Sequence, residues 1–73
     1  MQATMSRHET TGEKVKRARR LAGLSQVELA EKAGVSENTI WRLETDRSAI
    51  ARWSNMRSIA KALNVEVRDL IGE

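Results

Sequence analysis

The clearest helical repeat of apolar positions among polar ones runs from residue 54 to residue 64. Four apolar side chains in this stretch are spaced i, i+3, i+4 and i+7, the spacing of one helical face. They are Met56, Ile59, Ala60 and Leu63. Asn64 can end such a helix, since asparagine tolerates the left-handed conformation. The pattern predicts an amphipathic helix that begins near Ser54 and ends at Asn64.

Capping signals predict another helix near the start of the chain. Thr10 and Glu13 have the spacing of a capping box, in which each side chain binds the other residue's backbone N–H. A helix from here through about Ala22 would be ended by Gly23, because glycine is favoured just past a helix end. Its inward face is expected to carry Val15, Ala18 and Ala22.

Two short helices joined by a tight turn follow. Ser25 and Glu28 repeat the capping-box spacing and predict a helix from Gln26 to Ala33, with Leu29, Ala30 and Ala33 facing inward. Gly34 ends this helix, and the next N-cap candidate, Ser36, comes two residues later. The sequence therefore predicts a further helix from Glu37 to Glu44.

The residues around this turn suit two helices that cross steeply. Ala30 allows the helices to touch, and Gly34 supplies the positive φ that a sharp turn requires. Val35, Ile40 and Leu43 are expected to hold the second helix on the first. The positions left pointing outward are Ser36, Glu37, Asn38, Trp41 and Arg42. A helix held in this way can lie in the major groove of DNA with its N-terminal residues at the base edges.

The remaining segments are shorter. Residues 45–53 interrupt the pattern and are predicted to form a loop. A fifth helix is predicted to end at Gly72 and to carry Val65, Val67, Leu70 and Ile71. Leu70 and Ile71 can serve as a dimer face or simply cover the core, and the sequence leaves both alternatives open.

Composition favours an all-α domain. Good helix formers are abundant, whereas Phe, Tyr and Pro are absent, which argues against a β-sandwich. Without cysteine, and with His8 as the single histidine, neither a disulfide nor a metal site is expected. No apolar run approaches the roughly 18 residues of a membrane span, and the polar start does not resemble a signal peptide. We expect a cytoplasmic protein with a mobile arm at residues 1–9 and one domain at residues 10–73.

Charge is distributed unevenly along the chain. Residues 1–23 carry a net charge of +4, residues 24–46 of −3 and residues 47–73 of +2. A basic frame around an acidic centre is compatible with a nucleic-acid partner. Glu28, Glu31 and Glu37 are accompanied by no nucleophile or ligand cluster, so no catalytic residue, cofactor or small-molecule substrate is expected.

Residues 12–72 resemble the helix-turn-helix of the lambda-repressor and Cro type, also called the xenobiotic-response-element family. The motifs that carry the resemblance are Gly23-Leu-Ser-Gln26, Leu29-Ala30, Ala33-Gly-Val-Ser36, Thr39-Ile40, Arg42-Leu-Glu44 and Ile59-Ala-Lys-Ala-Leu63. The chain departs from the family at Glu37, at Trp41, which replaces a residue that is usually small and polar, and at Thr45-Asp46, where glycine is frequent.

The resemblance implies roles for individual residues. Gln26 matches a glutamine that grips a backbone phosphate, and Arg19 with Glu44 matches a partly buried salt bridge. Asn38 and Arg42 match contact positions, and asparagine pairs well with adenine and arginine with guanine. The predicted DNA-binding set is Gln26, Ser36, Glu37, Asn38, Thr39, Trp41, Arg42 and Arg47. The predicted structural set is Arg19, Ala30, Gly34, Ile40, Leu43 and Glu44.

Three side chains have a second interpretation. Arg42 can pair with Asp46 one helical turn away instead of with DNA. Trp41 is costly to expose, so it is expected to touch either DNA or another protein. Trp53 is expected to anchor the core or a loop instead of forming a ligand site.

The sequence predicts a non-enzymatic transcriptional regulator that binds double-stranded DNA. It is expected to act as a repressor, as a homodimer on a palindromic operator, with recognition helices about 34 Å apart. The alternative is an antitoxin-type protein that binds a toxin and regulates its own promoter.

Overall fold

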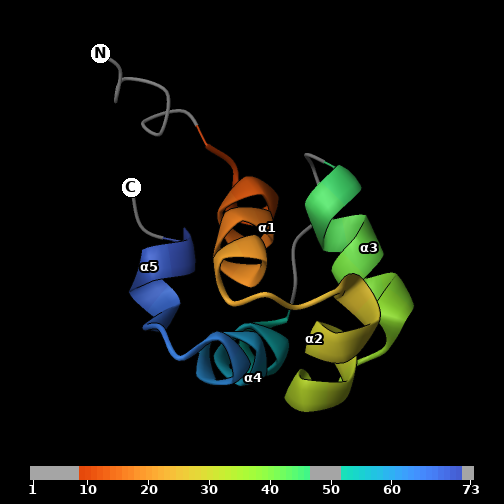
Figure 1. Ribbon diagram of the computed structural model, residues 1–73. Coiled ribbons are helices and arrows are strands. Elements are labelled where there is room, and N and C mark those ends of the chain that lie inside the picture. Colours follow the sequence, from red (N-terminus) through yellow and green to blue (C-terminus); the bar gives the residue numbers. More distant parts are fainter. Residues whose placement is uncertain (1–8, 47–51, 72–73) are drawn as a thin grey trace.

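Side-chain caps begin the first three helices of the computed structural model, which describes residues 9–46 and 52–71 (Figure 1). Thr10 and Ser25 each close the capping box that the sequence predicts, with Glu13 and Glu28 respectively. The Ser36 hydroxyl accepts the Thr39 N–H at 3.1 Å. Each cap satisfies backbone donors that would otherwise lack a partner at the helix start.

The described residues form five α-helices and no strand, which confirms the predicted all-α fold. The helices are α1 (Thr11–Leu21), α2 (Gln26–Ala33), α3 (Glu37–Thr45), α4 (Trp53–Leu63) and α5 (Val67–Ile71). Three predicted ends shift by one residue, since α1 ends at Leu21, α3 reaches Thr45 and α4 begins at Trp53. The fifth helix begins at Val67, so Val65 precedes it. No helix in the described part is long and apolar enough to cross a membrane.

The helices contact one another in a closed ring. In Figure 1, α1 lies between α5 and α3, while α4 and α2 close the far side. The contacts run α1–α3–α2–α4–α5 and back to α1. Each helix contributes one fully buried side chain to the space inside, and these are Val15, Leu29, Ile40, Ile59 and Leu70. The core is therefore shared by all five helices.

Three described residues with positive φ, Gly23, Gly34 and Asn64, lie where the chain turns between helices. Gly34, at the end of α2, has a φ of 73°, and Asn64, at the end of α4, has a φ of 61°. Both are the residues at which the sequence predicts the helix to stop. Asparagine is among the few side chains that tolerate this region, so α4 and α5 are joined without glycine.

Burial corrects two of the sequence expectations and decides between the two alternatives for Leu70. Ala22 is exposed because α1 ends at Leu21 and the chain turns away. Trp53 is 59% exposed and anchors no part of the core. Leu70 is buried against the core, whereas Ile71, the next residue round the helix, is 43% exposed. Leu70 is therefore a core residue and is not available as a dimer face.

Some expectations lie outside the described residues. These are the arm over residues 1–8, residues 47–51 of the predicted loop with the Arg47 site, and the helix end at Gly72. Glu9, at the predicted boundary of the arm, is described, and its carboxylate forms an ion pair with Arg17 of α1.

Gly12 lies at a close approach between α1 and α3. A Cβ atom at this position would lie 1.8 Å from the Leu43 carbonyl oxygen and 3.2 Å from the Glu44 Cα. The first turn of α1 therefore meets the last turns of α3 backbone to backbone. Gly12 is not among the predicted structural residues, although an isolated glycine inside a predicted helix can have a packing reason.

We expect Gly12→Ala to lower the free energy of unfolding by about 1–3 kcal/mol, the usual cost of overpacking. Urea denaturation followed by circular dichroism measures the loss. Alanine in a helix is otherwise about 1 kcal/mol more favourable than glycine, so the sign of the change is diagnostic. Arg20→Ala, at an exposed position of α1, serves as the control and should stay within about 0.5 kcal/mol of the parent. A Gly12→Ala variant as stable as the parent would contradict the close contact.

Candidate nucleic-acid interface

The α2–α3 unit fixes the orientation of α3. Ile40 is 0% exposed and Leu43 is 4% exposed, and both point into the core. On α2, Ala30 is 3% exposed, and its carbonyl accepts the Val35 N–H at 3.0 Å across the turn at Gly34. Because one side of α3 is committed to the core, the opposite side is fixed as the outer side.

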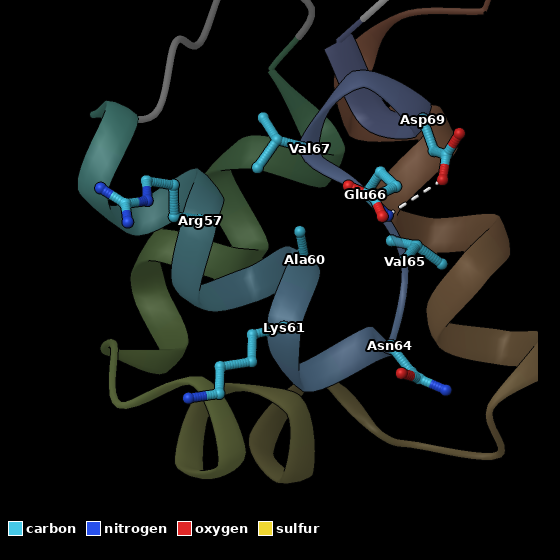
Figure 2. A pocket seen from close by; sticks show the side chains of 8 residues that line it. All are labelled: Arg57, Ala60, Lys61, Asn64, Val65, Glu66, Val67 and Asp69. Carbon is cyan, nitrogen blue, oxygen red and sulfur yellow. Dashed lines mark hydrogen bonds between the residues drawn. The ribbon is translucent and has the colours of Figure 1, made fainter.

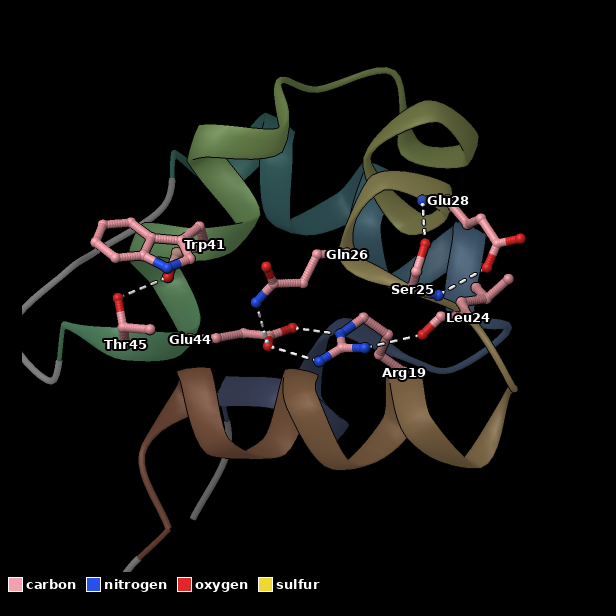
Figure 3. Close-up of polar contacts among 8 residues, drawn as sticks. All are labelled: Arg19, Leu24, Ser25, Gln26, Glu28, Trp41, Glu44 and Thr45. Atoms are coloured by element: carbon pink, nitrogen blue, oxygen red, sulfur yellow. Dashed lines mark hydrogen bonds and ion pairs between the residues drawn. The ribbon is translucent and has the colours of Figure 1, made fainter.

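The outer side of α3 carries a mixed set of exposed side chains. They are Glu37, Asn38, Trp41, Arg42 and Thr45. Trp41 is 52% exposed, and its ring points away from the Arg19–Glu44 pair (Figure 3). Among residues 9–46 and 52–71, Arg42 forms no ion pair, and its contact with Asp46 is the helical bond from the Asp46 N–H to its carbonyl. The alternative in which Arg42 pairs with Asp46 is therefore not among the ion pairs of the described residues.

Ser36 and Thr39 are engaged with each other. Besides the cap, the Ser36 and Thr39 hydroxyl oxygens lie 2.8 Å apart, so one of them donates to the other. Ser36 is exposed, and Thr39 is half-buried. These two predicted site residues therefore help to start α3. One of their two hydroxyl protons is engaged in the hydrogen bond between them.

A buried ion pair joins α1 to α3. Arg19 donates from Nε to one Glu44 oxygen at 2.7 Å and from Nη2 to the other at 2.9 Å (Figure 3). The same guanidinium donates from Nη1 to the Leu24 carbonyl at 2.8 Å. The Glu44 side chain is only 1% exposed, so its charge depends on these donors. A bidentate pair of this kind fixes the relative orientation of the two side chains and also balances their charges.

Arg19 keeps its charge under all ordinary conditions. The hydrogen bond to Glu44 raises the pKa of the Arg19 guanidinium, and the opposing effect of burial does not cancel it. A raised folded-state pKa means that the stabilisation is fully present below the unfolded-state pKa and is lost only as the pH rises through the folded-state value. For arginine that range lies in strong alkali, so Arg19 itself gives the fold no pH dependence near neutrality.

Gln26 is the third member of this network. Its Nε2 donates to the Glu44 carboxylate at 3.0 Å, from the first residue of α2. A carboxylate only accepts hydrogen bonds, so the amide nitrogen must face Glu44. The amide oxygen then points away from Glu44, and the second amide N–H remains available. Arg19, Gln26 and Glu44 therefore tie α1, α2 and α3 together at one point.

A concave surface lies between α4 and α5, apart from the outer side of α3. It forms an open cavity of about 510 Å³. Figure 2 shows the side chains that line it, which are Arg57, Ala60, Lys61, Asn64, Val65, Glu66, Val67 and Asp69. Asp69 accepts the Glu66 N–H at 3.0 Å within this lining. In the part of the chain that the structure describes, no group of three or more His, Cys, Asp or Glu side chains could hold a metal ion.

Comparison with known proteins identifies relatives of the chain. Residues 11–71 match the helix-turn-helix domain family. The chain is also 36% identical over 64 residues to the immunity repressor protein of Bacillus phage phi105. That similarity covers 88% of this chain and 44% of the phage protein, so the chain spans less than half the length of this relative.

The Arg19–Glu44 pair gives a testable stability prediction. We expect Arg19→Met to cost about 3–5 kcal/mol of unfolding free energy, because it leaves the buried Glu44 carboxylate without its main partner. Combining it with Glu44→Leu should recover most of the loss, since neither charge is then buried. Chemical denaturation of the three variants measures both effects.

Arg17→Met is the matched control for this series. Arg17 also forms an ion pair, with Glu9, but its side chain is 55% exposed. Exposed pairs contribute about 1 kcal/mol or less, so this variant should remain close to the parent. Equal losses for Arg17→Met and Arg19→Met would contradict the dependence of the fold on the buried pair.

Proposed function

The chain belongs to the lambda-repressor-like helix-turn-helix family, and from this membership we propose that it is a sequence-specific DNA-binding transcriptional regulator. In this proposal α3 lies in the major groove of double-stranded DNA. The main observation in its support is the orientation of α3 on the core. Its inner side is buried at Ile40 and Leu43, and its outer side exposes Asn38, Trp41 and Arg42. Such a helix matches the dimensions of the major groove.

Asn38 and Arg42 are the proposed hydrogen-bonding readers. Asparagine can give adenine a donor and an acceptor together, and arginine can donate two hydrogen bonds to guanine. Arg42 is exposed on the outer side of α3, where its guanidinium can reach a base. Glu37, in the first turn of α3, would accept from a cytosine amino group.

Gln26 is the proposed phosphate contact. It stands at the start of α2, where backbone N–H groups and the helix dipole favour an anion. Its remaining amide N–H can donate to a phosphate while the other holds Glu44. Ser36, Thr39 and Arg47 complete the proposed DNA-binding set, and Arg47 lies outside the described residues.

Repression by a homodimer is the proposed mode of action. The similarity to a phage immunity repressor supports a repressor that blocks access of polymerase to an operator. Two-fold symmetry of a dimer would be mirrored in a palindromic site, with recognition helices about 34 Å apart. A DNA partner also fits the expected cytoplasmic location. The antitoxin alternative stays a prediction, which a toxin that co-purifies with the chain would support.

Selection of bound sites from random duplex DNA tests the proposal. We expect the chain to enrich a two-fold symmetric motif, with half-sites one helical turn or a multiple of it apart. On that motif, Arg42→Ala should cost about 1–3 kcal/mol and relax the preference at one base pair of each half-site. Binding curves at two salt concentrations separate this effect from a phosphate contact, which would lower the salt slope by about 1.

Arg57→Ala is the matched control because it removes the same charge from an exposed position on α4. It should change no base preference. A chain that enriches no sequence, or an Arg42→Ala variant whose loss is the same on every duplex, would contradict base reading by α3.

A further inference from the structure

Trp41 places a large apolar ring in the middle of an otherwise polar surface. It is 52% exposed on the outer side of α3, next to Asn38, Arg42 and Thr45, which are also exposed. Its position is fixed because Ile40, the residue before it, is fully buried in the core. The Trp41 side chain therefore leaves α3 on its outer side.

The chemistry of the ring limits what it can recognise. An indole offers one N–H donor and no acceptor, so it is poorly suited to read bases by hydrogen bonding. The major groove displays nitrogen and oxygen groups on every base pair, and one apolar group, the 5-methyl of thymine. An apolar side chain aimed into the groove gains most by covering that methyl group.

Thr45, one turn towards the C-terminus, does not alter the preference of the Trp41 ring for a methyl group. The Thr45 hydroxyl donates to the Trp41 carbonyl at 2.8 Å, so its proton is engaged with the helix backbone (Figure 3). Hydrogen-bonding side chains near the ring are Asn38, one turn towards the N-terminus, and Arg42, the following residue. The outer side of α3 thus combines an apolar contact at Trp41 with hydrogen-bonding groups beside it.

We propose that Trp41 is a specificity-determining residue that reads the 5-methyl group of a thymine in each half-site of the operator. The inference rests on the proposed function and adds to it a base identity and a chemical group. A protein partner could also bury Trp41, but it would cover Asn38 and Arg42 as well and would compete with DNA for the same surface.

Replacing thymine by deoxyuridine tests the inference, since it removes only the methyl group. The probe is the duplex that the parent chain selects, with each thymine replaced in turn. We expect one thymine in each half-site at which the replacement weakens binding about fourfold, the effect of removing one buried methyl-sized group. In Trp41→Ala the ratio of the two dissociation constants at that position should fall to about 1.

Trp53→Ala is the matched control, because Trp53 is the other tryptophan of the chain and is 59% exposed at the start of α4. It should keep the fourfold ratio. Parent binding that ignores deoxyuridine at every thymine, or a ratio that survives in Trp41→Ala, would overturn the inference and leave the proposed function standing. A parent chain that selects no duplex would overturn both.

Discussion

The buried ion pair between Arg19 and Glu44 is the interaction on which the arrangement of the helices depends most. It joins α1 to α3 through two hydrogen bonds, holds the Leu24 carbonyl between α1 and α2, and takes in Gln26 at the start of α2. A chain of this size buries little apolar surface and has a small stability margin. One polar cluster that orients three helices therefore matters more here than it would in a large domain.

Close packing complements this pair on both sides of α3. Gly12 lets the backbone of α1 approach Leu43 and Glu44, while Ile40 and Leu43 fill the shared core. The contact at Gly12 sets the distance of α3 from α1. The burial of Ile40 and Leu43 sets the rotation of α3 about its own axis. With distance and rotation fixed, Asn38, Trp41 and Arg42 are presented as a rigid surface.

Local sequence signals predict the helices well and the contacts between them only in part. Capping residues and apolar spacing predict five helices, because both act within one or two turns. They do not say which neighbour packs on a helix, so Ala22 is expected inside but is exposed, and Trp53, expected to anchor the core or a loop, is not part of the core. The hydrogen bond from Gln26 to Glu44 spans 18 positions and depends on how α2 and α3 cross. The resemblance to a known family supplies the Arg19–Glu44 pair, which periodicity alone does not.

A nuclear magnetic resonance titration of the isotope-labelled chain with its selected duplex tests the central claim most directly. We expect the largest chemical-shift changes on the side chains of Asn38, Trp41 and Arg42 and on the Gln26 amide. The buried Arg19 and Glu44 should keep their contacts. Changes centred on the exposed side of α1 and α5, around Leu21 and Ile71, with α3 unaffected, would contradict it.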